Sequence, residues 1–172
     1  MNTNRNRNRR KRISAIPGMK SGRCPYCGSQ VVLRSADGIY KENNAGTMLY
    51  ACSKYPACDA YVRVLPGTKI PVGSLANGSL RVLRREAHLY FDQLYQSGFM
   101  SRNEAYDWLA WVLQMPLSQA HIGYLGEYYC RRVIDECKRL LDKHCKVQAG
   151  LRNGYKRDLG RVSGDGINAA KR

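Results

Sequence analysis

The sequence has no long apolar run, and this absence argues against a membrane protein. No stretch approaches the roughly 18 consecutive apolar residues that a membrane-spanning helix needs. The N-terminus also lacks the apolar core of a secretory signal. We therefore expect no membrane partner and a cytoplasmic location, in the cytoplasm or nucleoid of the cell.

Catalytic motifs are equally scarce. The chain has 3 histidines, and it contains no Walker loop, no Gly-x-Ser-x-Gly elbow and no His-Glu-x-x-His motif. His88 and Asp92 could meet His121 as a general base or a hydrolytic metal site. No cluster of carboxylates accompanies them, and histidines more often hydrogen-bond between helices. The sequence therefore favours a non-enzymatic protein.

Acidic residues are few, and basic residues gather at the two ends. The chain has 13 Asp and Glu against 29 Lys and Arg, which gives a formal net charge of +16. Residues 1–23 carry eight basic and no acidic side chains, and residues 146–172 carry seven basic and two acidic ones. A nearly balanced body with basic ends is typical of a folded module whose arms bind phosphate. Residues 1–12 alternate Asn and Arg, so residues 1–23 are predicted to form a disordered basic arm, or else a solubilising tail.

Four of the 7 cysteines form two close pairs. Cys24 and Cys27 are followed by Gly28, and Cys52 and Cys58 enclose a loop with Pro56. Four thiolates that arrive as two pairs close a tetrahedral structural zinc site, with no open position for a substrate. The alternative, two disulfides or four unrelated thiols, fits the paired spacing less well. We predict one Zn²⁺ per chain, bound by Cys24, Cys27, Cys52 and Cys58.

The sequence around these cysteines resembles a known zinc ribbon. The motif Cys-Pro-x-Cys-Gly at 24–28, the strand at 31–34, Tyr-Ala-Cys-Ser at 50–53 and Tyr-Pro-x-Cys at 55–58 are similar to the repeated ribbons at the C-terminal end of type IA topoisomerases. Those ribbons bind single-stranded DNA, so the resemblance implies single-strand binding. It covers roughly residues 24–63, and the interval between the cysteine pairs is longer here. No topoisomerase catalytic domain fits in the chain.

A longer region, roughly residues 24–140, is similar to a family of zinc-finger-containing domains that is common in phages and prophages. The similarity rests on Ala87-His88, Phe91-Asp92, the segment 101–109 and His121-Ile-Gly123. It implies a phage or prophage setting and carries no activity.

The ribbon is expected over residues 24–65. Strands are predicted at 31–34, 39–41, 47–51 and 60–64, with turns at 36–38 and 43–46. Tyrosines alternate with cations here, as in surfaces that stack the bases of a single strand. Some of these rings must also form the small core. The candidate nucleic-acid contacts in the ribbon are Tyr26, Arg34, Lys41, Tyr50, Lys54, Tyr55, Tyr61 and Arg63.

The rest of the chain predicts helices. Pro and Gly make residues 66–78 a linker, and apolar residues at helical spacing predict helices at about 79–96, from the capping box at 101–104 to before Pro116, and at 127–144. Arg81, Arg84 and Arg85, on the outer face of the first helix, complete the candidate contacts. Cys130, Cys137 and His144 are too far apart along a helix to share one ion, so the thiols are expected in the core.

The predicted fold is α+β: a basic arm (1–23), a zinc ribbon (24–65), a linker (66–78), a three-helix domain (79–145) and a flexible basic tail (146–172). We predict that it binds nucleic acid, preferably single-stranded DNA or RNA. The alternative is a protein-interaction module in which the ribbon and the helix face with Trp108 and Trp111 dock onto a host or phage protein, for example to inhibit a defence or transcription complex.

Overall fold

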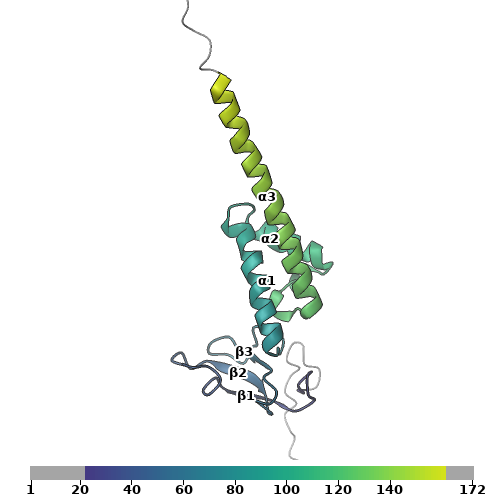
Figure 1. The fold of residues 1–172 in the computed structure, drawn as a ribbon. Helices are drawn as coiled ribbons and strands as arrows, with labels where there is room; N and C mark the ends of the chain where they lie inside the picture. Colours follow the sequence, from purple (N-terminus) through teal and green to yellow (C-terminus); the bar gives the residue numbers. More distant parts are fainter. Residues whose placement is uncertain (1–21, 162–172) are drawn as a thin grey trace, which may run out of the picture. The chain divides into compact units, whose positions relative to one another are not determined.

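The computed structural model describes residues 22–161, with side chains for residues 22–147. The chain divides into two compact units, one comprising Met1–Arg85 and His121–Cys130, the other Glu86–Ala120 and Arg131–Arg172. A three-stranded antiparallel sheet is followed by three α-helices, which confirms the α+β class (Figure 1). Residues 1–21 of the predicted arm and residues 162–172 of the predicted tail lie outside the described residues.

The sheet belongs to the first unit and has the order β1-β2-β3, with β1 at Val31–Ser35, β2 at Met48–Cys52 and β3 at Tyr61–Arg63. Residues paired across antiparallel strands share a face of the sheet. The register Leu33↔Tyr50↔Val62 therefore defines an inner face, and these side chains pack in or against the core. The register Arg34↔Leu49↔Arg63 defines the opposite face, which we call the outer face; Arg34 and Arg63 are exposed there, whereas Leu49 between them is fully buried.

The strand predicted at residues 39–41 is wrong. The N–H groups of Ile39 and Tyr40 both donate to the Ala36 carbonyl, at 2.9 Å each. These donors close a tight turn at Gly38, which has φ 74°, so they cannot pair with a neighbouring strand. Tyr40 is thereby brought back beside the sheet, where its ring meets Tyr61 edge to face with 6.1 Å between centroids.

Residues 66–78, predicted as a linker, instead run back along β3. Leu65 N–H donates to Ile70 O at 2.8 Å across the turn that contains Gly67, and isolated bridges join Val64 to Pro71 and Tyr61 to Ala76. Proline and glycine do interrupt the strand, but they form a reversal whose far side pairs with β3. Leu75, from this returning segment, is part of the ribbon core.

The glycine-rich segment before the last helix also belongs to the first unit. It contains the short 3-10 helix η2 (Ile122–Tyr124), and Ser74 N–H donates to Gly123 O at 2.9 Å. A Cβ on Gly73 would overlap the Gly123 carbonyl, and a Cβ on Gly123 would lie 2.7 Å from Val72 O. Glycine at both positions permits this close backbone approach.

The second unit contains α2 (Arg102–Leu113), the 3-10 helix η1 (Leu117–Gln119) and the later parts of α1 (Gly78–Gln96) and α3 (Glu127–Arg161). Phe91 is fully buried and meets Tyr106 edge to face at 5.1 Å between centroids. Cys137 is buried as a small hydrophobic side chain, as is Cys130 in the first unit, which confirms the sequence-based interpretation of these thiols.

The last helix is longer than predicted. The sequence predicted an end near His144 and a flexible tail from residue 146, but α3 continues to Arg161. No proline follows Pro116, and a glycine inside a helix costs only about 1 kcal/mol relative to alanine, which weakens a helix without ending it. Despite this length, no helix in the described part of the chain is both long and apolar enough to cross a membrane.

Candidate metal centre and nucleic-acid surface

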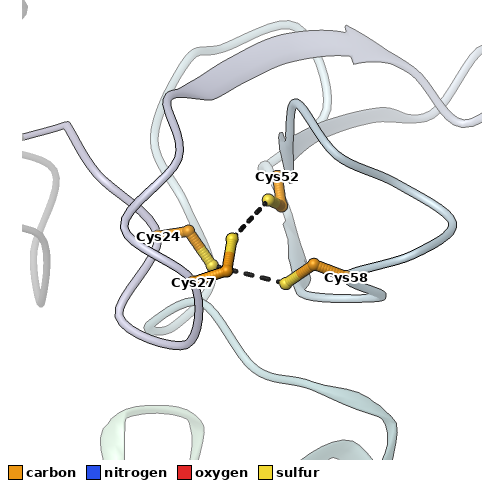
Figure 2. A group of neighbouring side chains, drawn as sticks. All are labelled: Cys24, Cys27, Cys52 and Cys58. Atoms are coloured by element: carbon orange, nitrogen blue, oxygen red, sulfur yellow. Dashed lines mark hydrogen bonds between the residues drawn. The ribbon is translucent and has the colours of Figure 1, made fainter.

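The four cysteines of the predicted zinc site come together in the first unit (Figure 2). All four Sγ atoms lie within 4.8 Å of one another. The Cys24 and Cys58 sulfurs are 3.6 Å apart, and the Cys27 and Cys52 sulfurs are 3.4 Å apart. A disulfide would require about 2.05 Å, so the four cysteines are free thiols.

These separations fit one tetrahedral zinc ion. With Zn–S bonds of about 2.3 Å, the edges of the sulfur tetrahedron measure about 3.8 Å. The observed sulfurs are close to that size, so the ligands are already gathered around one position. Because cysteine fills all four positions, the site is closed and its role is structural.

Two loops position the ligands by backbone hydrogen bonds. In the first loop, Gly28 N–H donates to Cys24 O at 2.9 Å, and Gly28 takes φ 71°, a conformation that favours glycine. In the second loop, Tyr55 N–H donates to Cys52 O at 3.0 Å and Cys58 N–H to Lys54 O at 3.1 Å. Lys54 N–H also points at the Cys52 sulfur at 3.5 Å. Backbone N–H groups directed at thiolates are expected in a site that binds metal through charged sulfur.

The thiols differ in their readiness to lose a proton. Hydrogen bonds from the side chain and backbone of Ser29 lower the pKa of Cys27 to about 6. Burial raises the pKa of Cys52 to about 12 and also raises the pKa of Cys58. Zinc binds the deprotonated ligands, so metal binding must release protons from the Cys52 and Cys58 thiols.

A closed four-cysteine centre on two loops of a small antiparallel sheet defines a zinc-ribbon protein. The chain belongs to a family of zinc-finger-containing domains, DUF3268, which matches residues 20–140. No curated protein matches the chain, and no solved structure does. The family supports zinc binding, and the four clustered thiols are consistent with one zinc ion per chain.

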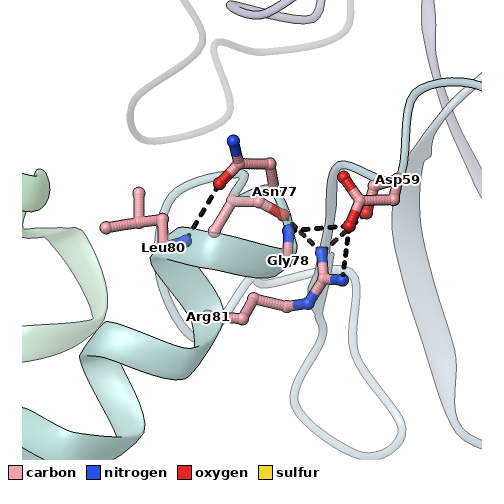
Figure 3. A network of polar contacts seen from close by, with 6 residues as sticks. Asp59, Asn77, Gly78, Leu80 and Arg81 are labelled. Atoms are coloured by element: carbon pink, nitrogen blue, oxygen red, sulfur yellow. Dashed lines mark hydrogen bonds and ion pairs between the residues drawn. The ribbon is translucent and has the colours of Figure 1, made fainter.

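Asp59, the residue after the last zinc ligand, connects the ribbon to the start of α1 (Figure 3). Its carboxylate accepts from Gly78 N–H at 2.7 Å and from Arg81 Nη2 at 3.2 Å. Arg81 Nη1 donates to the carbonyls of Asp59 and Ala76, both at 2.6 Å. Asn77 Oδ1 accepts from Leu80 N–H at 3.0 Å and caps the helix. We call Asp59, Asn77, Gly78 and Arg81 the helix clamp.

The structure corrects the predicted role of two candidate nucleic-acid contacts. Tyr50 is 7% exposed in the ribbon core, and its hydroxyl donates to Lys69 O at 3.1 Å. Arg84 is 9% exposed and donates to the backbone of Ser74 and Leu125. Neither side chain is free to contact a strand at the surface. Arg81 is partly exposed, but its N–H donors already bond to Asp59 and to the Ala76 carbonyl. Its guanidinium also lies 3.7 Å from the Tyr61 ring centroid.

The other candidates remain accessible. Tyr55 and Tyr61 are half-buried, and the exposed candidates are Tyr26, Arg34, Lys41, Lys54, Arg63 and Arg85. Arg34 and Arg63 flank Leu49 on the outer face of the sheet, and Tyr61 lies on the same face two residues before Arg63. Tyr40 was not among the sequence-based candidates, although it contacts Tyr61. Its sequence signals were the alternation of tyrosines with cations, in which Tyr40 precedes Lys41, and the turn at 36–38, which returns the chain toward the sheet.

His88 and Asp92 belong to the second unit and His121 to the first, so neither unit by itself contains the alternative site. Over residues 22–147 the four cysteines form the one group of side chains that could hold a metal ion. Asp92 instead accepts a hydrogen bond from the Tyr95 hydroxyl at 2.7 Å. This bond raises the pKa of Tyr95.

Proposed function

We propose that this zinc ribbon is a non-enzymatic binding module for single-stranded nucleic acid. The observation that carries the proposal is the outer face of the sheet. There Arg34 and Arg63 stand on the two edge strands, with Tyr61 and Tyr40 beside them. We call these four residues the outer-face set.

The outer-face set supplies the two interactions that single-strand binding requires. Arginines neutralise phosphates, and tyrosine rings stack on unpaired bases, each worth about 1–3 kcal/mol. Neighbouring strands lie about 4.8 Å apart, so the two arginine Cα atoms, two strands apart, are separated by roughly 10 Å. That spacing suits contacts with phosphates on either side of a stacked base. The closed zinc site holds the small sheet in shape and takes no part in chemistry.

The resemblance to topoisomerase ribbons supports the same function. The similarity to phage and prophage domains supports a phage or prophage protein that acts on nucleic acid in the host cytoplasm. DNA and RNA both offer the phosphates and unpaired bases that the outer-face set would recognise.

The test compares Arg34→Gln with Arg139→Gln in the zinc-loaded full chain. Both substitutions remove one exposed arginine charge, but Arg139 lies in the second unit, paired with Glu136. Fluorescence anisotropy with a labelled single-stranded oligonucleotide should show weaker binding for Arg34→Gln, with a salt slope smaller by about one. Arg139→Gln should leave both quantities unchanged. Equal losses in the two variants would mean that only net charge matters, and the outer face would have no special role.

One observation favours the rival function, docking onto another protein. Trp111 is 75% exposed on α2, whereas Trp108 is half-buried. Exposed tryptophans are frequent anchors of protein interfaces. Absorbance at 260 and 280 nm of the purified protein, before and after nuclease treatment, separates the two functions: bound nucleic acid raises the ratio, and a partner protein does not.

A further inference from the structure

The first unit contains a pocket of about 670 Å³ beside the outer face of the sheet. Its walls come from β3, from the returning segment at 72–76, from the first turns of α1 and from Gly123. Ligand sites for small molecules measure about 300–1,000 Å³. The pocket is therefore large enough for one nucleotide and too small for a folded partner.

The lining of this pocket is strongly cationic. Arg63, Arg81, Arg84 and Arg85 all contribute to its walls, and no acidic side chain of the described residues does so. Asp59 balances the charge of Arg81. The other three arginines have no carboxylate partner within the described structure. An anion is the ligand that such a pocket would bind best.

The buried charge of Arg84 is a second reason to expect an anion in the pocket. Its guanidinium uses four hydrogen bonds, two to Leu125 O at 3.0 and 2.8 Å, one to Ser74 O at 2.8 Å and one to Ser74 Oγ at 2.6 Å. These neutral acceptors fix the group but leave its positive charge uncompensated. Burial lowers the pKa of Arg84, which shows that the charge is costly there. A negative ligand in the pocket would offset that cost.

Arg63 and Arg85 are available for direct contact. Both side chains are exposed, and neither makes a hydrogen bond or an ion pair with another described residue. The planar guanidinium group of each arginine can donate two parallel N–H hydrogen bonds to the oxygens of a phosphate. The N-terminus of α1 does not compete for this role, because Asp59 and Asn77 already accept from the N–H groups of Gly78 and Leu80.

Two tyrosines give the pocket an aromatic wall. Arg81 covers one face of Tyr61, and Tyr40 meets Tyr61 at an interplanar angle of 65°. In an edge-to-face pair, the Tyr61 ring leaves at least one face of Tyr40 uncovered. A flat heterocycle can stack on that face.

We infer that the pocket is a binding site for a single nucleotide, with the phosphate between Arg63 and Arg85 and the base against Tyr40. Where the nucleotide belongs to a nucleic-acid strand, the inference rests on the proposed function. The same chemistry is offered by a free nucleoside monophosphate and by the 5′-terminal nucleotide of a strand. In the second case, the pocket holds the phosphorylated end of the strand through Arg63 and Tyr40, which the pocket shares with the outer-face set, and Arg34 contacts the strand beyond that end.

Calorimetric titration of the zinc-loaded full chain with adenosine monophosphate or uridine monophosphate tests the site. We expect saturable binding with one ligand per chain. Inorganic phosphate and unphosphorylated nucleosides should bind at least about tenfold more weakly, because each makes only part of the contacts. Arg85→Gln should weaken monophosphate binding at least about tenfold. The matched control is Arg139→Gln, since Arg139 is an exposed arginine of the second unit that does not line the pocket.

The outcomes separate the pocket from the proposed function. Absence of monophosphate binding, or equal losses in Arg85→Gln and Arg139→Gln, would overturn the nucleotide site even if oligonucleotides still bind. Monophosphate binding without any oligonucleotide binding would support the pocket and refute the single-strand function. Tighter binding of a 5′-phosphorylated oligonucleotide than of its 5′-hydroxyl counterpart, lost in Arg85→Gln, would identify the strand end as the source. Equal affinity for the two oligonucleotides would leave the free nucleotide as the ligand.

Discussion

Asp59 joins the metal centre to the first helix through a single carboxylate. It follows a zinc ligand in the sequence, accepts the Gly78 N–H and faces Arg81. The ion pair itself is partly solvent-exposed, with 47% of the aspartate and 24% of the arginine side chain accessible, so it contributes little. The bond to the helix N-terminus contributes more, because a carboxylate there satisfies an orphan donor and meets the positive end of the helix.

We predict that Asp59→Ala destabilises the first unit by about 1–2 kcal/mol, through loss of the bond to Gly78 N–H. Urea unfolding, followed by zinc release to a metallochromic chelator, measures the effect. Glu42→Ala is the control, since Glu42 is exposed in the same unit and has no ion pair in the described structure. An unchanged midpoint for Asp59→Ala would show that the helix clamp does not stabilise the ribbon.

At the residue scale, the sequence predicted the zinc ligands and misjudged one cation, Arg84, and one ring, Tyr50. The paired spacing of the cysteines is compatible with only a few kinds of site, so their role as zinc ligands can be predicted from the sequence alone. Arg84 offered no such signal. Its burial depends on the Leu125 carbonyl, 41 positions away in the chain, and no local pattern reports that contact. Tyr50 was equally ambiguous, because a tyrosine in a small ribbon serves either the core or the surface.

At the scale of elements, α2 shows a close agreement between local sequence and structure. Ser101 Oγ accepts from Glu104 N–H at 3.3 Å, and the Glu104 carboxylate accepts from Ser101 N–H at 2.7 Å. This is the capping box that the sequence predicted, because its donors and acceptors are all within four residues. The hydrogen bonds from Ser101 hold the pKa of Glu104 below its ordinary value of 4.5.

We predict that Ser101→Ala lowers the stability of α2 by about 0.5–2 kcal/mol. The folded-state pKa of Glu104 is depressed, so its contribution is present above pH 4.5 and is lost as the pH falls through the folded value. The stability difference between wild type and Glu104→Ala should therefore be measurable at pH 7 and shrink in acid. Both tryptophans lie in α2, so urea unfolding followed by tryptophan fluorescence reports on this helix. A pH-independent difference would contradict the assigned role of the carboxylate.

Other elements were less predictable because their partners are distant. Pro66 and Gly67 correctly mark a break, but only the pairing of Val64 with Pro71 turns that break into a reversal along β3. The turn at Gly38 competes with a strand for the same N–H groups, and a local pattern does not decide between them. Glycine among basic residues indicated a tail after residue 146, although glycine alone does not end a helix.

At the scale of the whole molecule, zinc binding is the condition for a folded ribbon. The sheet has three short strands and a small core that includes Cys24 and Cys52 themselves. A core of this size needs a structural metal for stability. Cys24 and Cys52 are thus metal ligands and also part of the hydrophobic core. Loss of zinc should expose these ligands together with the core residues around them.

Metal analysis of the purified protein should give one zinc per chain. Cys52→Ser/Cys58→Ser should abolish zinc binding and unfold the first unit, as should a strong chelator, since binding and folding are coupled. Cys145→Ser is the matched control, because Cys145 is exposed and lies outside the cluster. Two zinc ions per chain, or full retention by the double variant, would refute the assigned ligands.

The placement of charge in the whole chain also shapes the expected binding. The folded ribbon is nearly neutral overall, yet Arg63 and Arg85 line the pocket without an ion pair to a described carboxylate. Affinity should therefore depend on where these few cations lie and fall with salt according to the number of phosphates contacted.

The most direct test of the account is the location of the single-strand contact. Titration of the ¹⁵N-labelled, zinc-loaded full chain with a single-stranded oligonucleotide, followed by amide chemical shifts, measures it. The account predicts that the largest shift changes occur at Arg34, Tyr61 and Arg63, and that a duplex of the same sequence produces much smaller changes. Shift changes confined to α2, or equal changes with single strand and duplex, would contradict it.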